Sequence, residues 1–289
     1  MKRVAISHTT HYGFAAPVRL GQHRLFLRPR EGHDLRIAGS TLVILPEAVT
    51  AWRRDFYDNV LAVASFADDA VDSLAIESNV EVELYDTMPL DFIVEDHALR
   101  YPFRYGADER NALAPYLAPV YSDDRRFADW LESVRTFGKA RETFEVLAWI
   151  NQRIHNDIEY RVREEEGVLP PGESLRLAVG SCRDMAALFL ETCRRLGIAA
   201  RFVSGYVHGP ATEAGGASTH AWAEVYLPGA GWKGFDPTND AVVGPDHVPV
   251  AVHCNPEAIP PVSGSFIGPK EVSVEMSVEV KINQMAGVA

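Results

Sequence analysis

Three residues in the second half of the chain are of the types that can act as nucleophile, base and orienting acid: Cys182, His220 and Asp236. Cys182 opens the segment 180–197, whose apolar residues recur with the 3.6-residue period of a helix. Backbone N–H groups are unpaired at a helix N-terminus and favour a thiolate, which is the nucleophilic form of cysteine. The alternative for a lone cysteine at this position is a small buried core residue.

The histidine and the aspartate fall on two predicted strands, 218–227 and 231–236, which flank a short turn containing Pro and Gly. A hairpin centred near that proline places His220 directly opposite Asp236, with Cβ atoms about 5 Å apart. A carboxylate that accepts from one imidazole nitrogen leaves the other nitrogen free to exchange a proton with a nucleophile. Together with Cys182, this pair predicts covalent catalysis at a carbonyl group.

The helix that carries the cysteine is predicted to be amphipathic, and to end at Gly197. Its apolar stripe consists of Met185, Leu188, Phe189 and Leu196, and its charged side of Asp184, Glu191, Arg194 and Arg195. Asp184 is interpreted as a first-turn acid that complements the helix dipole, in preference to a catalytic group.

The remaining elements indicate an α+β protein with two domains. Short strands without helical periodicity are predicted at 4–14, 19–27, 35–45, 60–66 and 74–85. They indicate an antiparallel, sandwich-like β domain over 1–115, interpreted as an accessory module. Helices at 126–134 and 142–158, a β and loop passage at 159–179, a strand at 199–208 and a one-sided strand at 271–281 are assigned to a second domain over 116–289.

Composition narrows the classes of function. The formal net charge of −12 argues against a general nucleic-acid or anionic-membrane binder, so the expected partner is a peptide or a small molecule. Three cysteines are too few for a disulfide scaffold and fit a reducing compartment. Because neither a signal peptide nor an apolar run of transmembrane length is evident, the cytoplasm is the expected location.

Two patterns in the sequence resemble cofactor sites but lack the structural context that such sites require. Residues 229–234 match a dinucleotide fingerprint in letters, but a strand follows them where that motif requires a helix. A zinc site was considered for Cys182, Cys193, His208, His220, His253 and Cys254. The first two cysteines are eleven residues apart, about 16 Å along a helix, which is too far for both to bind one ion. No metal and no cofactor is therefore predicted, and Cys193 is interpreted as core.

Two aromatic residues are candidates for substrate binding. Trp222 shares a strand face with His220 and could place an indole beside the thiol, and Tyr206 precedes it on the neighbouring predicted strand. Core packing is the alternative for both.

The same segments carry a family resemblance. Residues 180–186, 201–206, 219–226 and 231–239 read GSCRDMA, RFVSGY, THAWAEVY and GWKGFDPTN. In combination they resemble the transglutaminase-like superfamily. The N-terminal stretches HTTHYGF and RLFLRPR are similar to the β region that precedes this core in bacterial members. The likeness covers all but about the last thirty residues.

The resemblance implies a papain-like α+β core, in which a nucleophile helix packs on an antiparallel sheet. It implies Cys182 as nucleophile, His220 as general base and acid, and Asp236 as orienting residue. Bacterial members are mostly described as cysteine peptidases or amide hydrolases. The expected function is therefore thiol-dependent hydrolysis of a peptide or amide bond. Acyl transfer to an amine and a catalytically silent peptide-binding module are the alternatives.

Overall fold

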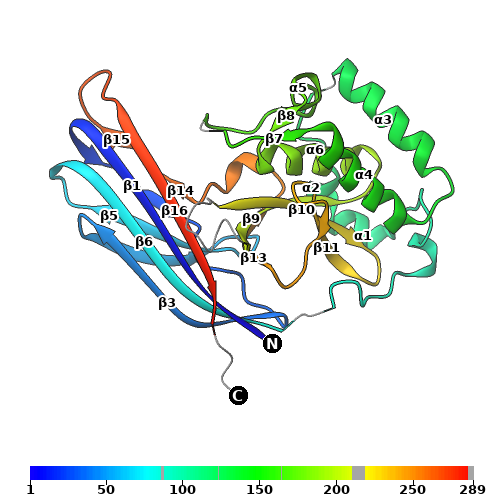
Figure 1. Cartoon of the computed structure of the whole chain (residues 1–289), viewed down its shortest axis with the longest axis horizontal. Helices are drawn as coiled ribbons and strands as arrows, with labels where there is room; N and C mark the ends of the chain where they lie inside the picture. The colour runs from blue at the N-terminus through cyan, green and yellow to red at the C-terminus, as the bar shows by residue number, and fades with distance from the viewer. Residues whose placement is uncertain (86–87, 123, 164, 210–218, 286–289) are drawn as a thin grey trace.

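The computed structural model describes residues 1–85, 88–122, 124–163, 165–209 and 219–285, and it has two lobes, a β-sandwich and a mixed helical and β core (Figure 1). The sandwich strands are β1 (Lys2–Leu20), β2 (His23–Leu25), β3 (Leu35–Leu45), β4 (Ala48–Arg54), β5 (Val60–Phe66), β6 (Ala70–Leu84), β14 (Val262–Ser263), β15 (Phe266–Ile267) and β16 (Val274–Gln284). The core strands are β7 (Glu159–Tyr160), β8 (Val179–Gly180), β9 (Ala200–Val207), β10 (His220–Leu227), β11 (Gly231–Asp236), β12 (Ala241–Val242) and β13 (His247–His253).

Helices are confined to the core lobe and to the segment that leads into it. They are α1 (Ala107–Ala112), α2 (Ala114–Leu117), α3 (Arg125–Gly138), α4 (Thr143–Asp157), α5 (Pro171–Leu177) and α6 (Cys182–Arg195), with short 3-10 turns η1 (Asp96–Ala98) and η2 (Pro256–Ala258). None of the helices in the described residues is long and apolar enough to cross a membrane.

The sandwich is built from two antiparallel sheets, ordered β15-β1-β6-β3 with β16 also on β1, and β14-β2-β5-β4. Alternate residues of the 19-residue β1 are buried, because successive side chains of a strand point to opposite faces. Leu25 of β2 packs with Leu74 and Ile76 of β6 between the two sheets. The predicted antiparallel β fold of this region is confirmed. Two details differ: β1 includes the first predicted strand and part of the second, and β4 was not predicted.

The C-terminal strands differ from the predicted division, which placed everything after residue 115 in the second domain. β16 pairs antiparallel with β1 from Val4 opposite Gln284 to Phe14 opposite Val274, so the end of the chain completes the N-terminal sandwich (Figure 1). The alternation of residues 271–281 predicted a strand with one exposed face, and β16 has this pattern in its second half, where Val280 and Ile282 are buried, whereas Val274 and Met276 are exposed. Alternation cannot say which strand will be the neighbour, and here that neighbour is the first strand of the chain.

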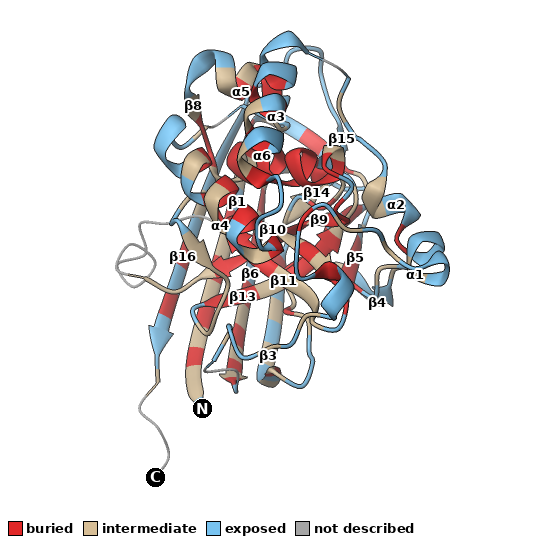
Figure 2. Ribbon diagram, turned by 90° about the vertical axis from the view of Figure 1, so that its right-hand side faces the viewer, coloured by how far each residue is buried: buried red, intermediate tan, exposed pale blue. Residues whose placement is uncertain are grey.

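The core sheet has the order β12-β11-β10-β9-β13, and α6 packs against β10 and β9 with α4 and α5 beside it. Its buried residues are continuous with those of the sandwich, so that Val82 and Ile282 belong to the same apolar cluster as Phe189 and Val248. Figure 2 shows these buried residues gathered in the middle of the molecule, on strands of both lobes and on helices of the core lobe. The predicted α+β core with a helix packed on an antiparallel sheet is confirmed.

The cysteine helix is buried on its charged side as well as on its apolar side. Asp184 and Glu191 are 0% exposed, and Arg194 is 4% exposed. Glu191 accepts from the backbone of Val120, while Arg194 donates to the carbonyl of Ala200. The apolar period of α6 was predicted correctly, but its charges bind neighbouring segments, which sequence periodicity alone does not distinguish from a solvated face.

Three short helices were not predicted. α1 and α2 lie in the connecting segment, and α5 lies in a passage that was interpreted as strand and loop. α5 has seven residues and begins at Pro171, so it is too short to show a helical period, and its proline resembles a turn signal.

Candidate active site

Cys182 is the first residue of α6, and a buried acid fixes the chain around it. Ser181 is the N-cap residue, and its backbone N–H and its hydroxyl both donate to Oδ2 of Asp184 at 2.8 Å. Asp184 also accepts hydrogen bonds from the guanidinium of Arg163 and from the backbone N–H of Leu169. Cys182 itself is half-buried. Asp184 therefore holds the loop before the helix in place, in agreement with its interpretation as a structural acid.

The hairpin that carries the histidine and the aspartate is shifted from the predicted register. Leu227 pairs with Gly231 and Ala223 with Phe235, so Asp236 continues opposite Trp222 rather than opposite His220. The hairpin is centred on Gly229, one residue beyond the predicted centre at Pro228, and the glycines at 229 and 231 have positive φ values of 84° and 75°. A shift of two residues keeps the same strand face, so His220 still reaches Asp236.

His220 is bonded to the aspartate through one ring nitrogen. Its Nε2 lies 2.8 Å from Oδ2 of Asp236, and the ring is 9% exposed. Burial disfavours the charged imidazole, but hydrogen bonds with Asp236 and Cys182 outweigh it and raise the pKa of His220 to about 10. With Nε2 on the carboxylate, Nδ1 is the nitrogen left to exchange a proton with the thiol.

Asp236 is 0% exposed and is surrounded by hydrogen-bond donors. The backbone N–H groups of Thr238 and Asn239 donate to its Oδ1, and the side-chain amide of Asn239 donates to its Oδ2 at 2.7 Å. Burial would raise the pKa of this carboxyl, but its hydrogen bonds with His220 and His247 hold the pKa well below its usual range. The group is therefore a fixed anion beside the imidazole.

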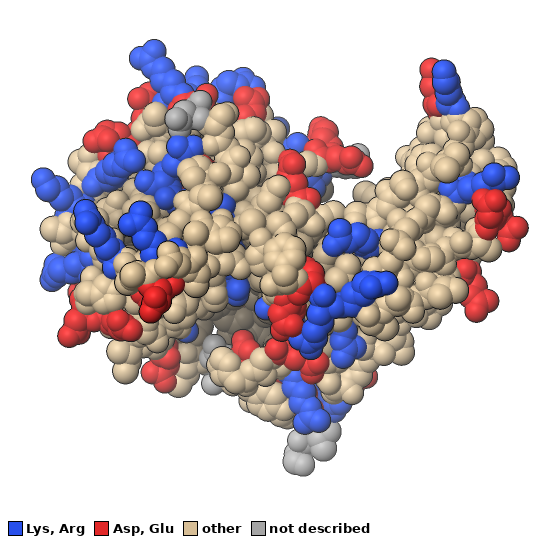
Figure 3. Space-filling view, turned by 180° about the vertical axis from the view of Figure 1, so that it is seen from behind, with Lys and Arg blue, Asp and Glu red and all other residues tan. Residues whose placement is uncertain are grey.

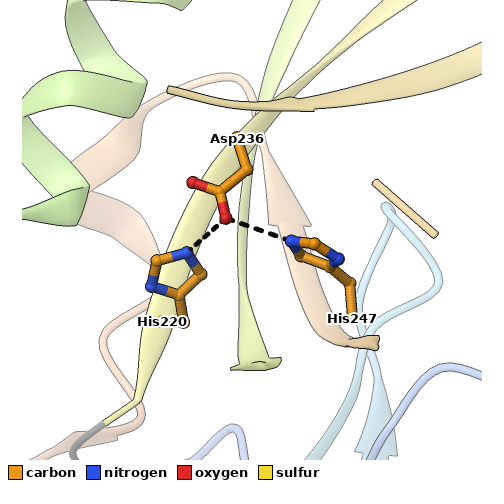
Figure 4. Close-up of side chains that lie close together, drawn as sticks. All are labelled: His220, Asp236 and His247. Atoms are coloured by element: carbon orange, nitrogen blue, oxygen red, sulfur yellow. Dashed lines mark hydrogen bonds and ion pairs between the residues drawn. The ribbon is translucent and has the colours of Figure 1, made fainter. Parts of the chain in front are cut away.

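His247 is a second histidine on the same carboxylate, and the sequence analysis missed it. Its Nε2 lies 3.0 Å from Oδ2 of Asp236, and the two rings approach this oxygen from different sides (Figure 4). His247 lies at the start of β13, which pairs with β9 and was not predicted as a strand. The sequence signal was the alternating apolar run at 248–252, which would have indicated a strand beginning at this histidine.

His220, Asp236 and His247 offer nitrogen and oxygen atoms within 4.8 Å of one another, a donor set that zinc can accept. The hydrogen bonds favour a different interpretation. Nδ1 of His247 accepts from the backbone N–H of Gly244, so the ring proton belongs on Nε2, the atom that faces the carboxylate. The nitrogen that would bind a metal is already a hydrogen-bond donor to Asp236.

Trp222 and Tyr206, the two aromatic candidates for substrate binding, are packed in the core. Trp222 is 0% exposed and lies edge-on to His247, with ring centroids 5.2 Å apart. Tyr206 is 2% exposed, and its hydroxyl lies 3.1 Å from Nδ1 of His8 in the sandwich. In this structure neither side chain presents surface to a ligand. Ser218, at the start of the predicted strand, lies outside the described residues.

The other two cysteines have different surroundings from Cys182. Cys193 is fully buried in the core, and burial raises the pKa of its thiol far above the usual range. Cys254 follows β13 and lies 2.8 Å from the hydroxyl of Tyr57. Among the cysteines, Cys182 is the one that the structure brings together with a histidine and a carboxylate.

Family models match two parts of the chain: the transglutaminase-like superfamily over residues 132–237, and the bacterial transglutaminase-like N-terminal region over residues 4–83. The chain belongs to the transglutaminase-like superfamily. An uncharacterized protein of Mycobacterium tuberculosis H37Rv is 29% identical over 96% of this chain and 92% of its own length. Bacillus subtilis YebA is 36% identical over 21% of this chain and 10% of its own length.

The fold of this transglutaminase-like chain is also similar to a solved structure. A candidate cysteine protease from Cytophaga hutchinsonii superposes with a TM-score of 0.74 at 17% identity, covering 100% of this chain and 92% of the other. At this identity the similarity concerns the fold alone. Because it extends over the whole chain, it includes the sandwich as well as the core.

Proposed function

We propose that this transglutaminase-like protein is a thiol-dependent hydrolase of peptide or amide bonds. One observation supports it above all others. The imidazole of His220 is bonded through Nε2 to a buried carboxylate at 2.8 Å and interacts with the thiol of Cys182 at the N-terminus of α6. These are the relations that nucleophile, base and orienting residue need, whatever their order in the chain.

In the proposed reaction the thiolate of Cys182 attacks the substrate carbonyl carbon, and a C–S bond forms as the C–N bond breaks. The imidazolium of His220 gives its proton to the leaving nitrogen, which departs as an amine. Neutral His220 then removes a proton from water, whose oxygen attacks the thioester. The carboxylic acid product leaves and the thiolate is restored. Asp236 keeps the ring oriented and stabilises its charged form throughout.

Water is the proposed acceptor in preference to an amine. A transferase must exclude water from the thioester, commonly with aromatic walls around the thiol. Trp222, the residue expected to supply such a wall, is 0% exposed and packs against the rings of His220 and His247, so it presents no indole surface to a ligand. This arrangement supports hydrolysis.

The test is incubation with a peptide library, with and without a competing primary amine, followed by mass spectrometry, with Cys182→Ala as the matched control. Hydrolysis predicts new carboxylates in both samples, and none with the variant. Products dominated by amine adducts would move the protein to acyl transfer. An absence of product together with an unreactive Cys182 would support a peptide-binding module instead.

A further inference from the structure

The strand that carries His247 is held along its length by the N-terminal sandwich. β13 is the last strand of the core sheet, so one of its edges has no strand beside it in that sheet. Three contacts join the sandwich to β13 and to the residue that precedes it, at intervals of three residues. Lys2 binds Asp246, the backbone N–H of Arg30 donates to the carbonyl of Pro249, and Asn59 binds Val252. All three partners come from the first 60 residues of the chain.

Asn59 makes the strongest of these contacts. It is 0% exposed, its side-chain amide donates to the carbonyl of Val252 at 2.8 Å, and its Oδ1 accepts from the N–H of Val252 at 2.8 Å. The amide thus satisfies both backbone groups of one residue, as a neighbouring strand would. Asp55 and Arg30 bind the same side chain, so its orientation is fixed from within the sandwich.

At the other end of β13, His247 links the strand to the carboxylate of Asp236. His247 follows Asp246, the residue bound by Lys2, and its ring is set by the N–H of Gly244 and by Trp222. Its Nε2 proton then defines one of the donor directions around Oδ2 of Asp236. The oxygen that faces His220 is therefore held from three sides: by Asn239, by His220 and by His247.

We infer that His247 is a positioning residue for the orienting aspartate, and that the N-terminal sandwich sets its place through the contact of Asn59 with β13. This rests on the proposed function for its kinetic consequence. It gives the sandwich a role in catalysis, although no side chain of the sandwich touches Cys182, His220 or Asp236 in the described contacts. A merely structural sandwich would change stability without changing the chemistry of the thiol.

The first test compares His247→Leu, which removes the donor, with His247→Gln, whose amide nitrogen can still donate to Oδ2. His247→Leu is expected to lower kcat by about 10- to 100-fold, the value of a hydrogen bond to a charged group, with KM nearly unchanged. It should also slow the alkylation of Cys182 by iodoacetamide near neutral pH. His247→Gln should restore most of both rates. Wild-type rates in His247→Leu would overturn the inference.

The second test is a double-mutant cycle with Asn59→Ala, using exposed Asn79→Ala in the same sandwich as the matched control. Asn59→Ala should lower kcat several-fold in the wild type and have no further effect in His247→Leu. An equal loss in both backgrounds would show that Asn59 does not act through His247. If Asn59→Ala does not fold, Lys2→Met, which releases Asp246, supplies the same cycle.

Alkylation of Cys182 requires no substrate, so it keeps this inference separate from the proposed hydrolysis. If no peptide is cleaved but the alkylation rates follow the predicted pattern, the proposed function fails and the positioning role stands. If the wild type cleaves peptides but His247→Leu and Asn59→Ala are alkylated at the wild-type rate, the positioning role is wrong and the proposed function stands.

Discussion

At the scale of single residues, the surroundings of the three thiols differ enough to predict their reactivity. Cys182 lies at a helix N-terminus beside an imidazole, whereas Cys193 is fully buried and Cys254 is bonded to a tyrosine hydroxyl. Iodoacetamide at neutral pH should therefore alkylate Cys182 fastest, as measured by peptide mapping over time. Preferential labelling of Cys254 or Cys193 would contradict the assignment of the nucleophile.

The base and the orienting residue predict graded losses of activity. His220→Ala should abolish turnover, because no other group in the described contacts is placed to exchange a proton with the thiol. Asp236→Asn should lower kcat by roughly three to four orders of magnitude, since an amide cannot stabilise the imidazolium. Circular dichroism checks that both variants are folded. Substantial activity in His220→Ala would require a different base.

The raised pKa of His220 also predicts how stability depends on pH. Its pKa of about 10 in the folded chain exceeds the value of 6.5 for a free histidine. The charged ring therefore stabilises the fold fully below pH 6.5, and this contribution is lost as the pH rises towards 10. The difference in free energy of unfolding between wild type and His220→Gln should shrink over that interval in urea titrations. A constant difference would mean that the ring is not charged in the folded chain.

At the scale of elements, α6 depends on its buried charges. Asp184 accepts from Arg163, Ser181 and Leu169, and it is 0% exposed. Asp184→Asn should lower the free energy of unfolding by about 3–5 kcal/mol, because it removes the fully buried carboxylate that pairs with the partly buried guanidinium of Arg163. Glu173→Gln, which breaks the solvent-exposed pair with Arg176 on α5, is the control.

Chemical unfolding of the two variants provides the measurement. The midpoint for Glu173→Gln should be nearly that of the wild type, since exposed ion pairs contribute little. Equal midpoints for Asp184→Asn and Glu173→Gln would show that the charged side of α6 is not needed to hold its neighbours.

The sequence predicted correctly those helices and strands that a local period of apolar residues determines. It did not predict contacts between segments that are distant in the chain. The period of α6 and the hairpin strands were predictable, and a hairpin centre misplaced by one residue still left His220 and Asp236 on one face of the sheet. The partners of Glu191 and Arg194, and the neighbour of the last strand, come from distant parts of the chain. His247 was missed for the same reason, because only tertiary structure brings β13 to Asp236.

At the scale of the whole molecule, basic and acidic side chains are mixed over both lobes on the face seen in Figure 3. The lobes share one apolar cluster, and the contacts of Lys2, Arg30 and Asn59 with the segment 246–252 add to it. β16 contributes to that cluster through Val280 and Ile282, each 0% exposed. The last strand is thus part of the structural core.

Substitutions on β16 test this contribution. Ile282→Ala should lower the free energy of unfolding by about 2–5 kcal/mol, because it leaves a cavity among packed side chains. Met276→Ala lies on the same strand but is 58% exposed, and should change it by less than about 0.5 kcal/mol. Thermal or urea unfolding distinguishes the two. Similar losses for both would mean that β16 contributes mainly through its backbone hydrogen bonds.

The pairing of β1 with β16 also determines an order of events during synthesis. Topologically, the core lobe is an insertion within the sandwich, because β1 pairs on one side with β6 and on the other with β16, which follows the core lobe in the chain. Until β16 has been synthesised, the nascent chain displays one edge of β1, a long strand with unpaired backbone groups that could pair with another nascent chain. The core lobe can assemble while this edge is open, and the pairing of β16 then closes the sandwich.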